Sequence, residues 1–238
     1  MKNSSSIVVS IIAMLLSVIA IVMNIFGFGK KVDVEKALVE KPELVVEALQ
    51  AYEVQQREQA MKAVEENLKE HADELYARAD DVVIGNPEGT KVLVEFFDFS
   101  CGFCRRVLPA IETIIANNPD VKVVAKPLTF LSPASKYAAK VAVASAEQGK
   151  FAEVYKALFK NEGRLSESKI DEIAQAAGVD MVKLKEDMNS AKVEKTISDA
   201  ASLASKVNVT GVPTMVFNNK LLQTLDPAVI QEAIDAAN

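Results

Sequence analysis

Two cysteines, separated by two residues, are the only thiols in this 238-residue chain, and they form the motif Cys101-Gly102-Phe103-Cys104. Because a thiolate attacks a disulfide, cysteines at this spacing can open a disulfide with one sulfur and close it with the other. The same spacing is typical of half a zinc site, which takes about four ligands. Cysteines pooled from two subunits could complete a copper or zinc centre, with little help from His71, the one histidine. The motif therefore predicts thiol–disulfide chemistry first and metal binding as the alternative.

The residues on either side of the motif predict how it is held. The run from Val92 to Ser100 is rich in Val and Phe and predicts a buried strand, whereas helix-favouring residues follow from Arg105. We therefore expect Cys101 at the point where a strand passes into the N-terminus of a helix. The free backbone N–H groups and the helix dipole favour an anion there, and a thiolate is such an anion. Cys101 is the predicted nucleophile, and Cys104, one turn later, is the predicted resolving thiol.

Composition and charge narrow the class of protein. Half of the residues are apolar and 25% are charged, as in a globular protein with a core, and the length allows one or two domains. The formal net charge of −6 gives no reason to expect nucleic-acid binding. Because both cysteines lie in the motif, none remains for a structural disulfide. We expect no cofactor and no metal at the site.

The N-terminus carries a membrane or secretion signal. Residues 7–26 form an uncharged apolar run that, as a helix, would cover about 30 Å, the hydrocarbon thickness of a bilayer. We predict an uncleaved signal anchor within residues 1–29, with a cleaved signal peptide as the alternative. A site that exchanges disulfides is expected on the oxidising side of the membrane, in the bacterial periplasm.

The sequence pattern of residues 30–80 predicts a helical stalk. Asp33 suits the N-cap of a short first helix, and Pro42 suits the first position of a long helix from Glu43 to about Arg78. A narrow apolar stripe recurs at intervals of seven through Val54, Met61, Leu68 and Leu75, with His71 as a packed helix residue beside it. Such an apolar stripe must be buried against another surface. We predict self-association through residues 33–79 as a dimer or trimer, and packing on the chain's own catalytic domain is the alternative.

The remainder, residues 81–238, predicts an α/β domain. A small leading strand precedes the active-site strand, and a helix from Cys101 to about Asn117 is bent by Pro109. The strand that begins at Val121 is expected to pair in parallel with the active-site strand. Residues 133–207 are wholly helical in pattern and predict an inserted subdomain. A hairpin around residues 218–220 and a final helix, capped by Asp226, complete the chain.

These features together resemble the thioredoxin superfamily and, within it, the DsbA-like thiol:disulfide oxidoreductases. The resemblance rests on the Cys-Gly-Phe-Cys motif after its strand, on Pro109, on the segment Gly211-Val212-Pro213-Thr214 before a strand, and on the helical block. It implies a thioredoxin-like fold with a helical insertion and protein disulfide oxidoreductase activity. The N-terminal helical segment is similar to that of the oligomeric ScsC-type members, which resemble disulfide isomerases.

The resemblance also implies roles for residues outside the motif. Glu95 matches a buried acid that assists proton transfer at the second cysteine, although a salt bridge to Lys126 is the alternative. Pro213 matches the family's cis proline, which leaves the backbone of Val212 to bind an extended substrate peptide. Gly102 and Phe103 are expected to contribute N–H groups and local sterics. Two arginines after the motif either add positive potential or are solvated: Arg105 and Arg106.

The sequence does not decide between a disulfide isomerase and a dithiol oxidase. The Gly102-Phe103 dipeptide is more similar to that of the isomerase DsbC, whereas Val212 before the proline is DsbA-like. We expect a disulfide isomerase with oxidase capability, and a monomeric DsbA-like dithiol oxidase is the alternative. The expected partners are unfolded or misoxidised secreted proteins and a membrane redox partner of the DsbB or DsbD type. A metal-binding protein and a surface protein with a vestigial redox fold are the alternatives from other classes.

Overall fold

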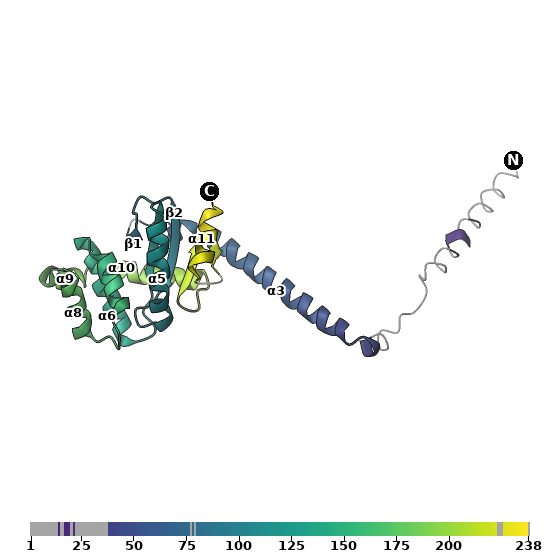
Figure 1. The fold of residues 1–238 in the computed structure, drawn as a ribbon, viewed down its shortest axis with the longest axis horizontal. Coiled ribbons are helices and arrows are strands. Elements are labelled where there is room, and N and C mark those ends of the chain that lie inside the picture. Colours follow the sequence, from purple (N-terminus) through teal and green to yellow (C-terminus); the bar gives the residue numbers. More distant parts are fainter. Residues whose placement is uncertain are drawn as a thin grey trace. The chain divides into compact units, whose positions relative to one another are not determined.

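The computed structural model describes residues 14, 17–19, 21, 38–76, 78, 80–222 and 226–237, and its contacts divide the chain into the units Met1–Arg57 and Glu58–Asn238 (Figure 1). Asp33 and most of the apolar run over residues 7–26 lie outside the described residues. No helix among the described residues is both long and apolar enough to cross a membrane. The signal anchor and the short first helix therefore stay predictions.

A five-stranded sheet forms the centre of the larger unit. The strands have the spatial order β1-β3-β2-β4-β5, with β2 in the middle. The central pair β2–β3 is parallel, as predicted, and the other three pairs are antiparallel. The bounds of the strands are β1 Val82–Gly85, β2 Lys91–Phe97, β3 Val121–Pro127, β4 Thr214–Phe217 and β5 Lys220–Leu221.

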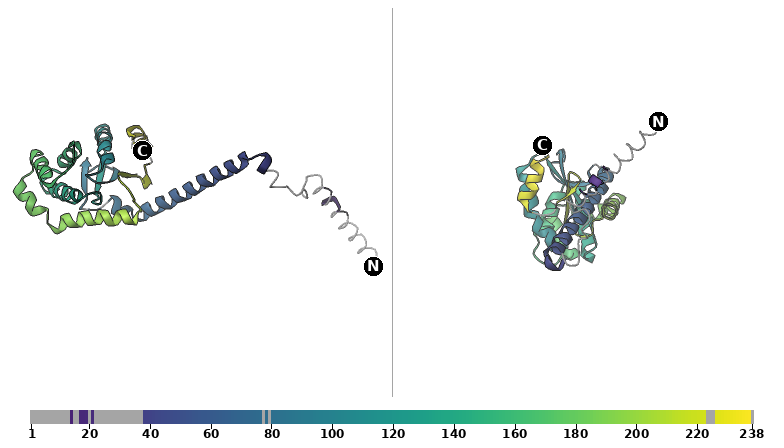
Figure 2. Two further views of the ribbon diagram at one scale, coloured as in Figure 1. Left: turned by 90° about the horizontal axis from the view of Figure 1, so that it is seen from below. Right: turned by 90° about the vertical axis from the view of Figure 1, so that its right-hand side faces the viewer.

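Helices cover both faces of this sheet. The active-site helix α5 (Gly102–Asn117) and the last helix α11 (Pro227–Asp235) share one hydrophobic core with α7, whereas α10 packs on the opposite face (Figure 2). The insertion predicted over residues 133–207 is present as five α-helices, one short 3₁₀ turn and their connections. Their bounds are α6 Pro133–Ser145, α7 Phe151–Lys160, α8 Glu167–Ala176, α9 Met181–Asp187 and α10 Ala191–Lys206.

The alternation of side chains along β2 separates the two cores. Leu93 and Phe97 point toward α5 and α7, whereas Val94 and Phe96 point toward α10, and all four are fully buried. A strand that is buried on both faces has a continuous apolar sequence, which explains why β2 could be recognised from its composition. The arrangement is a thioredoxin-like α/β fold with an inserted helical subdomain, as predicted.

The long N-terminal helix differs from the prediction. Helix α3 runs from Glu43 to Glu70 and ends there, His71 lies in a turn, and a short helix α4 follows over Ala72–Tyr76. Leu68 and Leu75 are both fully buried, against the face of the sheet that α10 also covers. The expectation of one helix to about Arg78 was therefore wrong, because this part of the segment packs on the chain's own domain.

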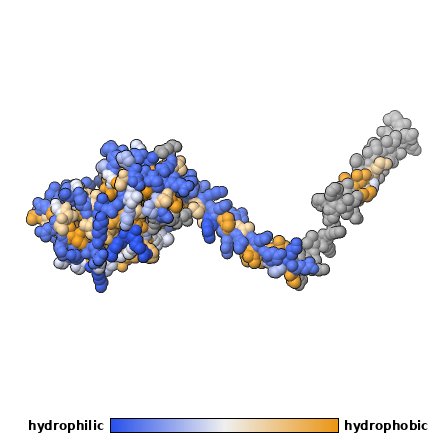
Figure 3. Space-filling view, viewed as in Figure 1, coloured by the Kyte–Doolittle hydropathy of each residue, from blue (hydrophilic) through white to orange (hydrophobic). Residues whose placement is uncertain are grey.

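The N-terminal half of α3 carries apolar side chains with no cover in the described chain. Figure 3 shows hydrophobic patches between hydrophilic residues along this helix. The exposed apolar residues include Leu44, Val45, Leu49, Tyr52 and Val54, each more than 40% accessible to solvent. Within the predicted stripe, Val54 is thus exposed, whereas Leu68 and Leu75 are buried on the chain's own domain. Self-association stays a prediction for the exposed part of α3.

Candidate active site

Cys101 caps the active-site helix, as its position in the sequence predicts. It is the N-cap residue of α5, with extended backbone, and its sulfur accepts a hydrogen bond from the Cys104 N–H at 3.3 Å. The loop before the helix is closed by a bond from the Cys101 N–H to the Asp98 carbonyl at 2.9 Å. An acceptor at this point satisfies helix N–H groups that have no partner within the helix, and the helix dipole favours negative charge there.

The predicted proline loop lies directly beside Cys101. The Val212–Pro213 peptide bond is cis, as predicted. The Cys101 thiol donates to the Val212 carbonyl across 3.5 Å, although 111 residues separate the two positions in sequence. Strand β4 begins at the next residue, Thr214, so the central sheet holds this loop in place. The structure therefore brings the predicted nucleophile and the predicted substrate-binding residue into contact.

The two thiols have different surroundings. Cys101 retains 7% of its surface exposed, whereas Cys104 is fully buried. Burial raises the pKa of the Cys104 thiol strongly, and a hydrogen bond from the Asp98 backbone opposes this rise. Both thiols are unbridged, and Phe103 between them is 63% exposed. An incoming disulfide thus meets Cys101 first, and Cys104 must lose a tightly held proton before it can attack.

Glu95 is a buried acid on the central strand, with no exposed surface. The Tyr155 hydroxyl donates to its Oε2 at 2.6 Å, and its Oε1 has no hydrogen-bond partner among the described residues. Burial raises the pKa of Glu95 to about 7, and the hydrogen bond from Tyr155 opposes the rise. A carboxyl group with such a pKa can both accept and release a proton near neutrality. Its charge also contributes to the raised pKa of Cys104, so the two groups interact.

Lys126 does not pair with Glu95, which corrects the alternative offered above. In the parallel register, Lys126 lies opposite Phe96 and Glu95 lies opposite Ala125. Because neighbouring residues of a strand point to opposite faces, Lys126 and Glu95 lie on different sides of the sheet. The Lys126 Nζ instead donates to Asp81 at 2.5 Å and to the Glu74 carbonyl at 3.0 Å.

The side chain of Asp98 connects two parts of the fold. Its side chain is fully buried and accepts three hydrogen bonds, from the Ser100 N–H at 2.8 Å, the Leu131 N–H at 3.1 Å and the Ser135 hydroxyl at 2.6 Å. These bonds join the loop that carries Cys101 to the first turn of α6. Asp98 therefore ties the active-site loop to the helical insertion.

Sequence reasoning missed the roles of Tyr155 and Asp98. A signal for Tyr155 was present, because it lies on the apolar stripe of α7 with Phe151, Val154, Leu158 and Phe159, and a phenol in a core needs a hydrogen-bond partner. The identity of that partner depends on how the insertion packs on the sheet. For Asp98 the signal was an acid directly after an apolar strand, next to the motif.

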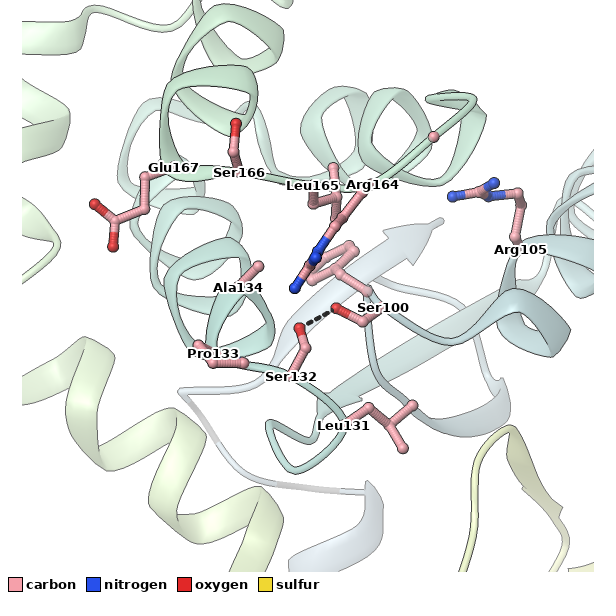
Figure 4. A pocket seen from close by; sticks show the side chains of 12 residues that line it. Ser100, Arg105, Leu131, Ser132, Pro133, Ala134, Arg164, Leu165, Ser166 and Glu167 are labelled. Atoms are coloured by element: carbon pink, nitrogen blue, oxygen red, sulfur yellow. Dashed lines mark hydrogen bonds between the residues drawn. The ribbon is translucent and has the colours of Figure 1, made fainter.

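A cavity of about 670 Å³ opens beside the motif (Figure 4). Arg105 from α5 and Arg164 from the segment before α8 both line it, together with Ser100 and Ser132, whose hydroxyls lie 2.7 Å apart. No group of three or more His, Cys, Asp or Glu side chains that could hold a metal ion occurs in the described part of the chain.

A match to the DSBA-like thioredoxin domain family covers residues 92–235. This range includes both cysteines, Glu95, the cis proline and the whole helical insertion. The chain belongs to the DsbA-like thioredoxin family. Membership confirms the predicted family.

Solved structures with related sequences share the fold. A thioredoxin-like oxidoreductase from Silicibacter pomeroyi is 32% identical, and the match covers 69% of this chain and 96% of that protein with a TM-score of 0.66. A linker-deletion mutant of ScsC from Proteus mirabilis is 25% identical, and the match covers 85% of this chain and 90% of ScsC with a TM-score of 0.68. The likeness to ScsC agrees with the predicted ScsC-type subgroup.

Curated relatives include proteins of two kinds. The Na(+)/H(+) antiporter NhaA 1 of Mycolicibacterium gilvum is 35% identical over 145 residues, which are 59% of this chain and 24% of the antiporter. The probable disulfide bond formation protein D of Bacillus cereus is 25% identical over 180 residues, which are 70% of this chain and 83% of that protein. The chain thus spans about a quarter of the length of the antiporter that it matches.

Proposed function

We propose that this DsbA-like chain exchanges disulfides with secreted polypeptides in the periplasm, as a disulfide isomerase that can also act as an oxidase. The observation that carries the proposal is the contact between the Cys101 sulfur and the Val212 carbonyl, beside a fully buried Cys104. An extended substrate segment that binds the backbone of Val212 by strand addition would place its own sulfur next to Cys101.

The proposed first step forms a mixed disulfide. The Cys101 thiolate attacks one sulfur of a substrate disulfide, a new bond joins Cys101 to that sulfur, and the other substrate sulfur leaves as a thiolate. In isomerisation, a different substrate thiolate then attacks the sulfur that is joined to Cys101, which restores the Cys101 thiolate. The substrate gains a rearranged disulfide, and no net oxidation or reduction takes place.

The second cysteine gives the same site a redox reaction. Cys104 loses its proton to the Glu95 carboxylate and attacks the Cys101 sulfur, which releases the substrate thiolate and leaves a Cys101–Cys104 disulfide. The substrate disulfide is thereby reduced by two electrons while the two cysteines are oxidised. In the reverse direction the oxidised site transfers its disulfide to a reduced substrate, and a membrane redox partner of the DsbB or DsbD type resets the site.

Two features support action on unfolded proteins by more than one subunit. Large apolar side chains surround the site on the outside, with Phe103 at 63%, Phe130 at 59% and Leu131 at 46% exposure, and such surfaces suit the apolar segments of unfolded chains. The exposed apolar stripe within residues 38–57 suits association with a second or third copy of the same segment. We further propose that residues 7–26 tether the protein to the inner membrane.

The function is tested with a substrate protein that carries scrambled disulfides. We expect the reduced full-length chain to restore the native disulfides, and we expect the oxidised chain to introduce disulfides into a reduced peptide. The Cys101→Ser variant is the control for both assays. If native disulfides were restored no faster than with Cys101→Ser, the protein would not be an isomerase. If the chain then still oxidised the reduced peptide, it would be a dithiol oxidase.

A further inference from the structure

The cavity beside the motif has no part in the proposed disulfide exchange. Its walls come from three places: the loop and first turn that hold Cys101, the entry to α6, and the segment that leads into α8. Figure 4 shows the side chain of Arg105 entering from the active-site helix and that of Arg164 from the insertion. Neither Val212 nor Pro213 lines this cavity, so it is separate from the proline loop.

Two arginines, neither with an anionic partner among the described residues, give the cavity its positive charge. No described residue forms an ion pair with the guanidinium group of Arg105 or of Arg164, and the Nε of Arg105 is buried without a hydrogen-bond partner. The cavity's one carboxylate belongs to Glu167, which points away from both guanidinium groups in Figure 4. By contrast, several lysines of the insertion pair with acids, as Lys140, Lys185 and Lys192 do.

The chemistry of these groups suits a carboxylate. A guanidinium group is a planar fork of donors that binds both oxygens of a carboxylate, and it stays charged at every relevant pH. A buried N–H with no acceptor is costly, so a ligand that supplies an acceptor is favoured. The hydroxyls of Ser100 and Ser132 add further polar groups to the same wall.

We propose that this cavity is a substrate subsite, which binds an acidic side chain of the polypeptide whose cysteine reacts with Cys101. The proposal rests on the proposed function, because the ligand arrives as part of the substrate. Ser100 adjoins Cys101 in sequence, and the Arg105 N–H donates to the Cys101 carbonyl at 3.1 Å, so the subsite begins next to the nucleophile. A substrate with Asp or Glu a few residues from its cysteine contacts the proline loop and the cavity together.

The test uses three peptides that differ only near one cysteine, which is held in a disulfide with a chromogenic thiol. One peptide carries two Glu residues beside the cysteine, the second carries two Gln, and the third carries two Lys. The reduced full-length chain reacts once with each peptide, and the dependence of the release rate of the chromogenic thiol on peptide concentration gives the single-turnover equivalents of KM and kcat/KM. We expect the Glu peptide to react about fivefold faster than the Gln peptide, and the Lys peptide to react slowest, at an ionic strength of about 0.05 M.

Two variants distinguish the subsite from general attraction. Arg164→Gln is expected to reduce the preference for Glu over Gln to about twofold, mainly through a higher KM for the Glu peptide. Lys183→Gln removes the same charge from an exposed position on α9 outside the cavity and should leave the preference at about fivefold. Equal loss of preference in both variants would overturn the subsite in favour of long-range steering.

Free glutarate at about 10 mM separates a peptide subsite from a site for small anions. Sodium chloride of the same ionic strength is the control, because any added ions increase the screening of charges. We expect glutarate to slow the Glu peptide more than sodium chloride does. Glutarate binding without any preference among the peptides would contradict a substrate subsite. Equal rates with the Glu and Gln peptides overturn the subsite alone, whereas no reaction with any peptide removes the proposed function and the subsite with it.

Discussion

Replacing Glu95 with Gln should make the stability of the protein less dependent on pH. Glutamine has nearly the same shape, and its amide oxygen can still accept the hydrogen bond that the Tyr155 hydroxyl donates to Glu95 at 2.6 Å. It cannot ionise, however. The substitution therefore isolates the effect of placing an ionisable carboxyl group in a fully buried position.

The magnitude follows from the raised pKa. Burial moves the pKa of Glu95 from its ordinary value of 4.5 to about 7. The folded protein thus binds this proton more tightly than the unfolded chain does, and the resulting stabilisation is fully present below pH 4.5. It is lost as the pH rises through about 7. At about 1.4 kcal/mol per pH unit, the free energy of unfolding contributed by this group falls by about 3 kcal/mol.

Urea unfolding between about pH 4 and pH 8.5 measures this effect, since the change in free energy is obtained at each pH. We expect the free energy of unfolding of the wild-type protein to fall by about 3 kcal/mol relative to that of Glu95→Gln across this range. Glu153→Gln makes the same chemical change at an exposed position of α7 and is the control for the substitution itself. A difference for Glu95→Gln that does not vary with pH would refute the assignment of the raised pKa.

Further predictions concern the proton path, the active-site loop and the stalk. Glu95→Gln should slow the release of substrate from the mixed disulfide by about 10-fold or more, with little effect on its formation, in quenched-flow assays at pH 7. Tyr155→Phe removes the hydrogen bond that lowers the pKa of Glu95, so the pH at which the wild-type stability falls should move upward in urea titrations. Asp98→Asn deprives one of its donors of an acceptor and should cost about 1–3 kcal/mol in the free energy of unfolding. Removal of residues 1–57 should abolish the proposed self-association and leave a monomer in light scattering. An oligomer that persists without these residues would contradict association through the exposed apolar residues of α3.

The elements that hold the thiols could be predicted because their signals are local. The apolar run of β2 and the polar, helix-favouring residues after Cys104 differ sharply in composition, so the junction at Cys101 is set by neighbouring residues alone. The hairpin is similarly local, since Asn218 and Asn219 both adopt positive φ angles, which asparagine tolerates well. The burial of Glu95 followed from its place within an apolar strand.

The partners of the buried charges could not be predicted in this way. Lys126 and Glu95 lie on neighbouring strands, but the pairing register decides whether two such residues share a face, and a displacement of one residue reverses the answer. Tyr155 is 60 residues from Glu95 in the sequence and reaches it because α7 packs against the sheet. These contacts depend on the packing of elements rather than on their identity.

The break at His71 has the same origin. The seven-residue spacing of Leu68 and Leu75 is equally compatible with a continuous helix in a coiled coil. In the structure the surface that covers both residues is the chain's own sheet, and the helix ends at Glu70 so that α4 can pack there. Periodicity identified the apolar positions, whereas the identity of their cover required the fold.

In the proposed reaction, Cys101 attacks the substrate and Cys104 resolves the mixed disulfide. The most direct measurement incubates a disulfide-bonded substrate protein with Cys104→Ser and with Cys101→Ser, and then determines adducts by mass spectrometry under non-reducing conditions. We predict a stable adduct through Cys101 in the first variant and none in the second. An adduct through Cys104 in the second variant, or no adduct in either, would contradict the account.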